Sequence, residues 1–286
     1  MSDEFFLDQR LVRRAFDRAS VTYDRAAVVQ AEIRGRLLER LDLVRLRPSA
    51  VLDLGAGTGH ASRALKRRYP AAQVIAVDLS LGMLQESRRQ QGWRHRFQPL
   101  AADAHKLPIR SASVDLVLSN LMLEWCQDPD AVFAEIRRVL RPQGLLMFTT
   151  LGPDTLKELR DAWRRADRHT HVHRFIDMHD IGDALVRAGL AEPVMDTERL
   201  TITYPSLPAL VEELRASGST NIAHGRARGL TGKRRAQDFQ TVGRNGALAV
   251  SVEAVYGHAW AGAVREQQRE GGEVRVPVTA IRPRRS

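Results

Sequence analysis

The sequence has little cysteine and no long apolar run. Its single cysteine, Cys126, excludes an internal disulfide and a metal site built from several cysteines. No run of about eighteen apolar residues is present, so we expect no membrane span. The N-terminal segment MSDEFFLDQR also lacks the apolar stretch of a signal peptide, and we therefore expect a cytoplasmic protein without a membrane partner.

Acidic residues are fewer than basic ones. The sequence has 34 Asp and Glu against 44 Lys and Arg, which gives a formal net charge of +10 at pH 7. Such an excess favours an acidic partner, which is a nucleic acid, an anionic membrane or an acidic protein. Only 6% of the residues are aromatic, and they are not interleaved with basic residues as in proteins that bind single strands. Most basic residues are spread along predicted helices, apart from a cluster at 233–235 and the terminal RPRRS.

A glycine-rich turn lies between a predicted strand and a predicted helix, in the segment VLDLGAGTGH. A dinucleotide-binding turn has the pattern G-x-G-x-x-G, but His60 stands where its third glycine is expected. The pattern here is D-x-G-x-G-x-G, formed by Asp53, Gly55, Gly57 and Gly59. This pattern resembles motif I of the class I S-adenosylmethionine-dependent methyltransferases. The resemblance implies that the glycine backbone closely approaches the cofactor and that the Asp53 carboxylate lies near the ammonium of its methionine tail.

Two further acidic residues follow predicted strands. Asp78 ends the apolar segment 73–78, about twenty positions after the glycines, where a carboxylate accepts hydrogen bonds from ribose hydroxyls. Asp103 follows a third short strand, and we expect it to accept a hydrogen bond from the adenine amine, with the backbone amide of Ala104 available to a ring nitrogen. In open α/β sheets the ligand binds outside the carboxyl ends of the strands, so these residues are predicted to surround one cofactor.

Strands and helices alternate along most of the chain, which predicts an α/β fold. With 286 residues and 43% hydrophobic content, the chain is predicted to form one methyltransferase domain over 1–270, followed by a basic tail over 271–286. We expect seven strands in parallel order with right-handed crossovers. The expected parts of the domain are an N-terminal helical cap, a cofactor-binding core and two helical insertions that cap the active site, at 1–47, 48–152, 153–180 and 205–245.

Several segments are more selective than the glycine-rich turn. They include AFDRASVTYDRAAVVQAEI, SVDLVLSNLMLEWCQDPDAVFAEIRRVLRPQGLLMFTTLGPDTLKELRDAW, HRFIDMHDIGDAL and SLPALVEELRASGSTN. Together they resemble the malonyl-acyl-carrier-protein O-methyltransferases of biotin synthesis over almost the whole chain. The resemblance implies a Rossmann-like, seven-stranded class I methyltransferase sheet. It also implies transfer of a methyl group from S-adenosylmethionine to the free carboxylate of malonyl on an acyl-carrier protein, which is acidic as a family.

The same resemblance implies the remaining site residues. Tyr23 matches an N-terminal tyrosine of the family and is expected to close over the methionine tail or the malonyl carboxylate. Arg174, in the segment HRF, is expected to hold that carboxylate through two guanidinium donors. The further cofactor contacts that we expect are Leu79, Met83 and Asn120. No Ser-His-Asp set is apparent, and the reaction needs none, because a carboxylate is already ionised at neutral pH.

Other functions remain open at this stage. The alternating His169, His171 and His173 have no neighbouring acidic or cysteine ligands, so we expect no metal. Segments such as DTLKELR are similar to those of assembly factors of respiratory complex I that modify arginine, and the net charge suits an RNA methyltransferase or another small-molecule methyltransferase. The segment VEAVYGHAWA favours the carrier-protein enzyme, for which no stable nucleic-acid partner is expected.

Overall fold

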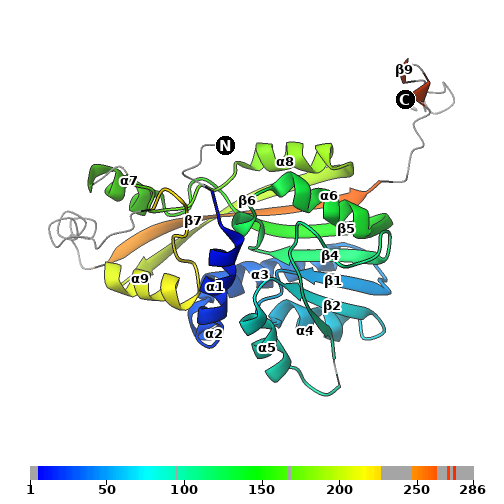
Figure 1. Ribbon diagram of the computed structural model, residues 1–286, viewed down its shortest axis with the longest axis horizontal. Helices are drawn as coiled ribbons and strands as arrows, with labels where there is room; N and C mark the ends of the chain where they lie inside the picture. The colour runs from blue at the N-terminus through cyan, green and yellow to red at the C-terminus, as the bar shows by residue number, and fades with distance from the viewer. Residues whose placement is uncertain are drawn as a thin grey trace.

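The computed structural model describes residues 6–94, 96–166, 169–226, 247–262, 269–270 and 273–274. A seven-stranded sheet lies at its centre, with helices on both faces (Figure 1). Its strands are β1 (Ala50–Leu54), β2 (Gln73–Asp78), β3 (Gln98–Ala101), β4 (Val114–Asn120), β5 (Leu140–Leu151), β6 (Leu190–Tyr204) and β7 (Leu248–Ala261). The order across the sheet is β3-β2-β1-β4-β5-β7-β6, and a separate pair joins β8 (Arg269–Glu270) to β9 (Glu273–Val274). The predicted seven-stranded α/β fold is confirmed.

Nine α-helices are found among the described residues. They are α1 (Gln9–Ala19), α2 (Tyr23–Ala26), α3 (Val28–Arg40), α4 (His60–Arg68), α5 (Leu81–Arg89), α6 (Pro129–Val139), α7 (Lys157–Ala166), α8 (Met178–Arg187) and α9 (Leu207–Ala216), with 3-10 turns η2 (Leu41–Leu43) and η3 (Leu123–Trp125). Among these residues, no helix is long and apolar enough to cross a membrane. The basic clusters at 233–235 and in the terminal RPRRS lie outside the described residues.

The sheet is mixed, which differs from the expected parallel order. Strands β3, β2, β1, β4 and β5 pair in parallel, whereas β7 runs antiparallel to both β5 and β6. The register explains the reversal, because Tyr204 at the end of β6 pairs with Leu248 at the start of β7. The second insertion therefore begins and ends at the same end of the strand pair. Because β7 returns beside β6 from that end, it must run antiparallel to β6.

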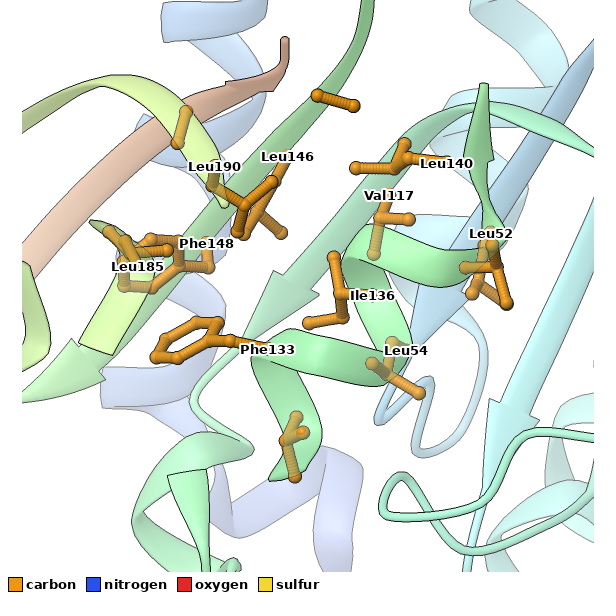
Figure 2. Packing of buried hydrophobic residues seen from close by; sticks show 14 of the residues in the cluster. Leu52, Leu54, Val117, Phe133, Ile136, Leu140, Leu146, Phe148, Leu185 and Leu190 are labelled. Atoms are coloured by element: carbon orange, nitrogen blue, oxygen red, sulfur yellow. The ribbon is translucent and has the colours of Figure 1, made fainter. Parts of the chain in front are cut away.

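Apolar side chains fill a core on each face of the sheet. On one face, Phe133 of α6 and Leu185 of α8 pack against β5 together with Phe148, whose ring centroid lies 5.8 Å from that of Phe133 (Figure 2). On the other face, Leu37 of α3 and Leu65 of α4 are fully buried against the strands. The spacing of these residues at three or four positions places them on one face of each helix.

Local signals fix the ends of the helices around this core. The Asp128 side chain accepts a hydrogen bond from the Ala131 amide (3.1 Å), and Pro129 occupies the first turn of α6, where a missing N–H costs nothing. Gly189, with φ of +77°, follows α8 in the left-handed conformation that glycine adopts most easily.

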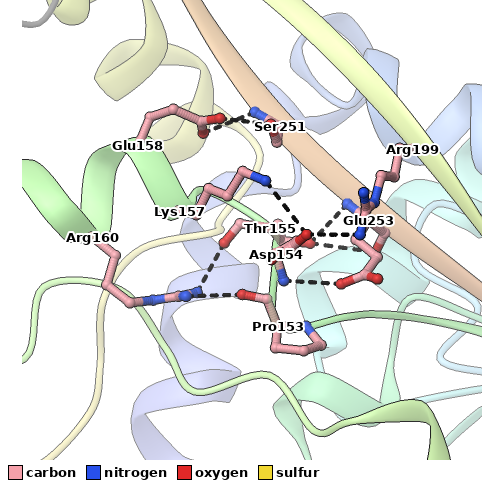
Figure 3. Close-up of polar contacts among 9 residues, drawn as sticks. All are labelled: Pro153, Asp154, Thr155, Lys157, Glu158, Arg160, Arg199, Ser251 and Glu253. Atoms are coloured by element: carbon pink, nitrogen blue, oxygen red, sulfur yellow. Dashed lines mark hydrogen bonds and ion pairs between the residues drawn. The ribbon is translucent and has the colours of Figure 1, made fainter.

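The first insertion is attached to the long strands β6 and β7 by polar contacts (Figure 3). The Glu158 carboxylate of α7 accepts hydrogen bonds from the amide and hydroxyl of Ser251, at 3.0 and 2.6 Å. Arg199 of β6 forms an ion pair with Asp154 at 3.0 Å. Beneath these contacts, an apolar cluster that includes Leu159 of α7 and Leu210 of α9 joins both insertions to the ends of the strands. The described parts of both insertions are therefore packed onto the ends of β6 and β7.

The close packing of β7 against β5 predicts a strong effect of substitution at Gly257. A Cβ atom at this position would lie 2.3 Å from Cζ of Phe148, whose fully buried ring has no free space to enter. We expect Gly257→Ala to lower the free energy of unfolding by about 1–3 kcal/mol in denaturant titrations.

The matched control is Gly35→Ala on α3, where a Cβ would meet nothing within 4 Å. This variant is expected to keep or slightly raise the free energy of unfolding, by up to about 1 kcal/mol, because alanine loses less backbone entropy in a helix. Equal stability of the two variants would contradict the packing argument.

Candidate active site

The predicted cofactor residues meet at the carboxyl ends of the strands. A cavity there, which we call the strand-end cavity, is lined by Gly55 and Gly57 after β1, Asp78 at the end of β2 and Asn120 at the end of β4. Its wall also contains the predicted residues Leu79, Met83, Asp103 and Ala104. The structure thus brings together eight of the ten residues proposed for the cofactor, the exceptions being Asp53 and Gly59.

The turn after β1 requires glycine for two separate reasons. Gly55 and Gly57 have φ of +78° and +54°, a region that side chains with a Cβ rarely adopt. In addition, a Cβ on Gly55 would lie 2.5 Å from Cγ of Met122 in the opposite wall. The glycines therefore leave the backbone exposed to the cavity and leave room for a ligand.

Asp78 connects this turn to the second strand. One carboxylate oxygen accepts a hydrogen bond from the Gly57 amide and the other from the Ser80 amide, both at 2.8 Å. Burial raises the pKa of the carboxyl to about 6, although these two hydrogen bonds oppose the shift. Each oxygen keeps a second acceptor position, which suits the paired hydroxyls of a ribose.

Asp53 and Gly59 lie behind the cavity wall. The Asp53 side chain is only 1% exposed, and it accepts a hydrogen bond of 2.5 Å from the hydroxyl of Ser62 in α4. Burial raises the pKa of Asp53 to about 6. Gly59 begins α4, and a Cβ there would meet Phe97 and Ser87 instead of the cavity. The Asp53 carboxylate thus holds the start of α4 under the turn and does not line the strand-end cavity, and its contact with the methionine tail stays a prediction.

A second, larger cavity of about 380 Å³ adjoins the first, and we call it the apolar cavity. It lies between the N-terminal cap and both insertions, with walls from α7, α9 and the ends of β6 and β7. The residues that line both cavities are Phe16, Tyr23, Leu121 and Trp125. Two ligands bound in the two cavities would therefore meet at these side chains.

Tyr23 is the predicted substrate residue that the structure places at this junction. Its hydroxyl makes no hydrogen bond with a residue that the structure describes. Burial raises the pKa of the phenol well above its usual range, so that the group remains protonated at neutral pH. Tyr23 can therefore donate a hydrogen bond toward a ligand in either cavity.

Arg174 does not reach this junction. It is exposed and lines two other cavities, one with Arg160 and Trp163 and one with Cys126 and Ile176. The Arg174 side chain points outward because Phe175, which follows it, and Val172, two positions before it, are both buried. The prediction that Arg174 holds the malonyl carboxylate is therefore corrected.

The sequence reasoning missed Glu124 and Phe16. Glu124 follows β4 and lines the apolar cavity, where its carboxylate accepts a hydrogen bond from the Thr150 hydroxyl at 3.2 Å. Burial raises the pKa of Glu124 to about 7. Phe16 stacks edge-on against Trp125 with ring centroids 5.1 Å apart. A glutamate shortly after the end of a predicted strand was the available sequence signal for Glu124. Phe16 gave no such signal, because it has the spacing of an ordinary apolar residue in an amphipathic helix.

The arrangement suits S-adenosylmethionine and does not suggest acid–base or metal chemistry. Asp78 offers charged acceptors for ribose hydroxyls, the glycine backbone allows close approach, and the rest of the wall is largely apolar, as in most small-molecule sites. Within the part of the chain that the structure describes, no three His, Cys, Asp or Glu side chains are grouped to hold a metal ion. Burial also raises the pKa of the Cys126 thiol, which keeps it protonated and unreactive.

Comparisons with known proteins agree with this geometry. A family model described as a methyltransferase domain matches residues 52–148. The malonyl-[acyl-carrier protein] O-methyltransferase of Methylovorus sp. (strain MP688) is 50% identical over 269 residues, covering 91% of this chain and 91% of that protein. The protein of the same name from Gallionella capsiferriformans (strain ES-2) is 46% identical, covering 95% of this chain and 97% of its own length.

Among solved structures, the YcgJ protein from Bacillus subtilis superposes with a TM-score of 0.60 at 16% sequence identity. The superposition covers 82% of this chain and 99% of that one. At this low identity, the likeness supports the fold alone.

The placement of Asp78 predicts a loss of cofactor affinity when its carboxylate is removed. Asp78→Ala should weaken S-adenosylmethionine binding by at least about tenfold, because a hydrogen bond to a charged group contributes about 1.5–3 kcal/mol. Calorimetric titration of the purified protein measures this change.

Asp115→Ala provides the matched control. The Asp115 carboxylate also accepts backbone hydrogen bonds, from the amides of Ser49 and Ala50, but it lies at the start of β4 and lines neither cavity. The Asp115→Ala variant should bind the cofactor as the unmodified protein does. Unchanged affinity in the Asp78 variant would remove this residue from the cofactor site.

Proposed function

The chain belongs to the malonyl-[acyl-carrier protein] O-methyltransferase family, and on this basis we propose that it methylates the free carboxylate of malonyl carried on an acyl-carrier protein. The observation that carries the proposal is the junction of the two cavities. The strand-end cavity is suited to S-adenosylmethionine, and the larger apolar cavity has room for an acyl thioester. Their shared wall at Tyr23 and Trp125 is where the methyl group and the carboxylate would meet.

The residues at the junction fit a reaction that depends on orientation. When bound, S-adenosylmethionine supplies an electrophilic methyl group on a sulfonium. The malonyl carboxylate is already an ionised nucleophile at neutral pH, so no side chain has to remove a proton. The protein's task is to hold one carboxylate oxygen in line with the methyl group and to exclude water. Leu121, Trp125 and Phe16 form apolar walls that serve this exclusion.

We propose that Tyr23 and Glu124 hold the other carboxylate oxygen. Tyr23 has a neutral hydroxyl at the junction, and Glu124 has a carboxyl whose pKa is about 7 in the apolar cavity. In its protonated form, Glu124 donates a hydrogen bond to an incoming carboxylate, whereas in its ionised form it repels one. We therefore propose Tyr23 and protonated Glu124 as the orienting groups in place of Arg174.

The expected product is a methyl ester of malonyl on the carrier protein. The ester removes the negative charge from the end of the acyl chain, so that enzymes of fatty-acid elongation can accept it as they accept an apolar chain. We propose on the family resemblance that this product enters synthesis of the pimeloyl chain of biotin. The positive net charge of the protein is consistent with an acidic carrier.

Methyl transfer tests the proposal directly. Incubation with labelled S-adenosylmethionine and malonyl-acyl-carrier protein should give a carrier that is heavier by one methyl group, and mild alkali should release the label as methanol because the bond is an ester. Mass spectrometry of the intact carrier measures this product. The control is the same carrier bearing acetyl, which has no free carboxylate and should remain unlabelled.

Two results would point to the alternatives. A cofactor-binding protein that labels neither carrier but modifies arginine in a protein extract would favour the activity of the complex I assembly factors. Label in RNA, together with retention on an RNA column at moderate salt, would favour an RNA methyltransferase, because phosphate contacts normally weaken steeply with salt.

The raised pKa of Glu124 predicts a pH dependence of substrate binding. Glu124 is protonated below pH about 7 and ionised above it. The KM for malonyl-acyl-carrier protein should therefore rise above this pH, by at most about tenfold per pH unit. Glu124→Gln keeps a hydrogen-bond donor without a titrating proton, so its KM should lack this rise. Steady-state kinetics of both proteins between pH 6 and about 9 make the comparison.

The other ionisable side chains in the wall of the apolar cavity are the same in both proteins, so their effects cancel in the comparison. They are Tyr23, His171, His173, Tyr204, Glu213 and Arg215. Glu213→Gln is the matched control, because Glu213 lines the same cavity but is already paired with the Tyr204 hydroxyl at 2.8 Å. This control should keep the rise. Identical pH profiles for the unmodified protein and Glu124→Gln would exclude Glu124 as an orienting group.

A further inference from the structure

The inner face of α1 forms part of the walls of both cavities. Val12, Ala15 and Ala19 are buried, and Phe16 lines the strand-end cavity and the apolar cavity. The helix is held at both ends by polar contacts. The Gln9 side-chain amide donates to the Trp125 carbonyl at 2.9 Å, and the Asp17 carboxylate accepts hydrogen bonds from the Ser80 hydroxyl and the Gly82 amide. The position of α1 is thus fixed relative to the candidate active site.

The outer face of α1 carries a row of arginines. Arg10, Arg14 and Arg18 recur every four residues and therefore share one side of the helix. All three are exposed, and none forms an ion pair with a residue that the structure describes. Arg13, by contrast, lies 3.6 Å from the Asp17 carboxylate. We call Arg10, Arg14 and Arg18 the arginine row.

The described fold favours only one member of this row, Arg18, whose positive charge lies in the last turn of α1. Like charges four residues apart on a helix repel each other and slightly destabilise it. Packing of the inner face of α1 does not require arginine on the outer face, where any polar residue would serve. An external surface of opposite charge would offset the repulsion. The row lies on the same helix as Phe16, which lines both cavities.

Helix α9 adjoins α1 and carries mixed charges, with Glu212 and Arg215 both exposed. The end of α9 contacts the end of α1, because the Thr22 hydroxyl donates to the Ala216 carbonyl at 2.8 Å and Gly218 lies against the Phe16 ring. Arg215, in the last turn of α9, lines the apolar cavity. Figure 1 shows α1 and α2 between α9 and α5. A protein bound on α1 would therefore lie beside the apolar cavity.

We propose that the arginine row on α1 is the docking surface for the acidic acyl-carrier protein. This inference rests on the proposed function, because it takes the substrate to be delivered by that protein. Electrostatic attraction to the row would steer the carrier to the side of the molecule where the apolar cavity can receive its acyl arm. The row would act on encounter and binding of the carrier, whereas Tyr23 and Glu124 act on the malonyl group.

The test compares two variants that each lose three exposed arginines. The first carries Arg10→Gln, Arg14→Gln and Arg18→Gln. The control carries Arg45→Gln, Arg47→Gln and Arg67→Gln, which are exposed residues in the loop before β1 and at the end of α4. Both variants lower the net charge equally. Only the first changes the surface of α1.

Kinetics with malonyl-acyl-carrier protein at several salt concentrations give the main measurement. We expect the KM of the first variant to rise about tenfold at low salt, as three exposed charge contacts of ordinary strength would give. Its KM should depend less on salt than that of the unmodified protein. Its kcat and its affinity for S-adenosylmethionine should stay the same, since Phe16 and the inner face of α1 are unchanged. The control variant should match the unmodified protein in every measurement.

Several outcomes would overturn the inference. They are an unchanged KM in the first variant, an equal rise in the control variant, or a loss of cofactor affinity that shows a displaced helix. Retention of the unmodified protein on RNA that disappears in the first variant, with KM unchanged, would assign the row to nucleic acid instead. If the unmodified protein binds cofactor but forms no methyl ester on malonyl-acyl-carrier protein, the proposed function fails and the docking inference fails with it. An active unmodified protein with an unaffected first variant removes the docking inference alone.

Discussion

The hydrogen bond between the Gly57 amide and the Asp78 carboxylate ties the turn after β1 to the end of β2. The strand-end cavity depends on this bond. It holds the glycine backbone open toward the cavity, and it aims a charged acceptor at the same space. Asp53 supports the turn through its hydrogen bond with Ser62. The buried Asp53 and the half-buried Asp78, both with carboxyl pKa values of about 6, therefore lie on opposite sides of the glycine-rich turn. A bound ligand with hydroxyl donors would compensate the cost of burying Asp78, which has no cationic partner among its principal contacts.

The apolar cavity depends on a different kind of organisation. Its walls come from α1 and α2, from the first insertion around α7 and from the second insertion around α9, which are far apart in the sequence. These segments meet because each buries an apolar stripe that the sheet alone does not cover, as in the cluster of Leu7 and Val12 with Ile222 and Ala223. Tyr23 and Phe16 belong to this cap and also face the strand-end cavity, so cap and core together form the candidate active site.

The distribution of charge separates two tasks. Inside the cavities, burial keeps Tyr23 and, at neutral pH, much of Glu124 in their uncharged forms, which suits the handling of an anionic acyl group. On the outside of the same cap, the arginine row is fully charged and exposed. One helix therefore presents an apolar wall to the ligands and a basic surface to a partner. This arrangement follows from the 3.6-residue period of the helix.

The sequence by itself determined the α/β fold, the glycine-rich turn, the acids at the strand ends and the family. These features are local, because the position of a residue at a strand end or in a turn follows from its neighbours in the chain. Only the tertiary structure decided which side chains face a ligand. It turned Asp53 beneath the turn and Arg174 toward solvent, and it reversed β7. It also brought Tyr23 and Phe16 to the junction of the two cavities and placed Glu124 in the wall of the apolar cavity. These outcomes depend on how the insertions pack against the sheet, and packing between distant segments leaves no periodic signal in the sequence.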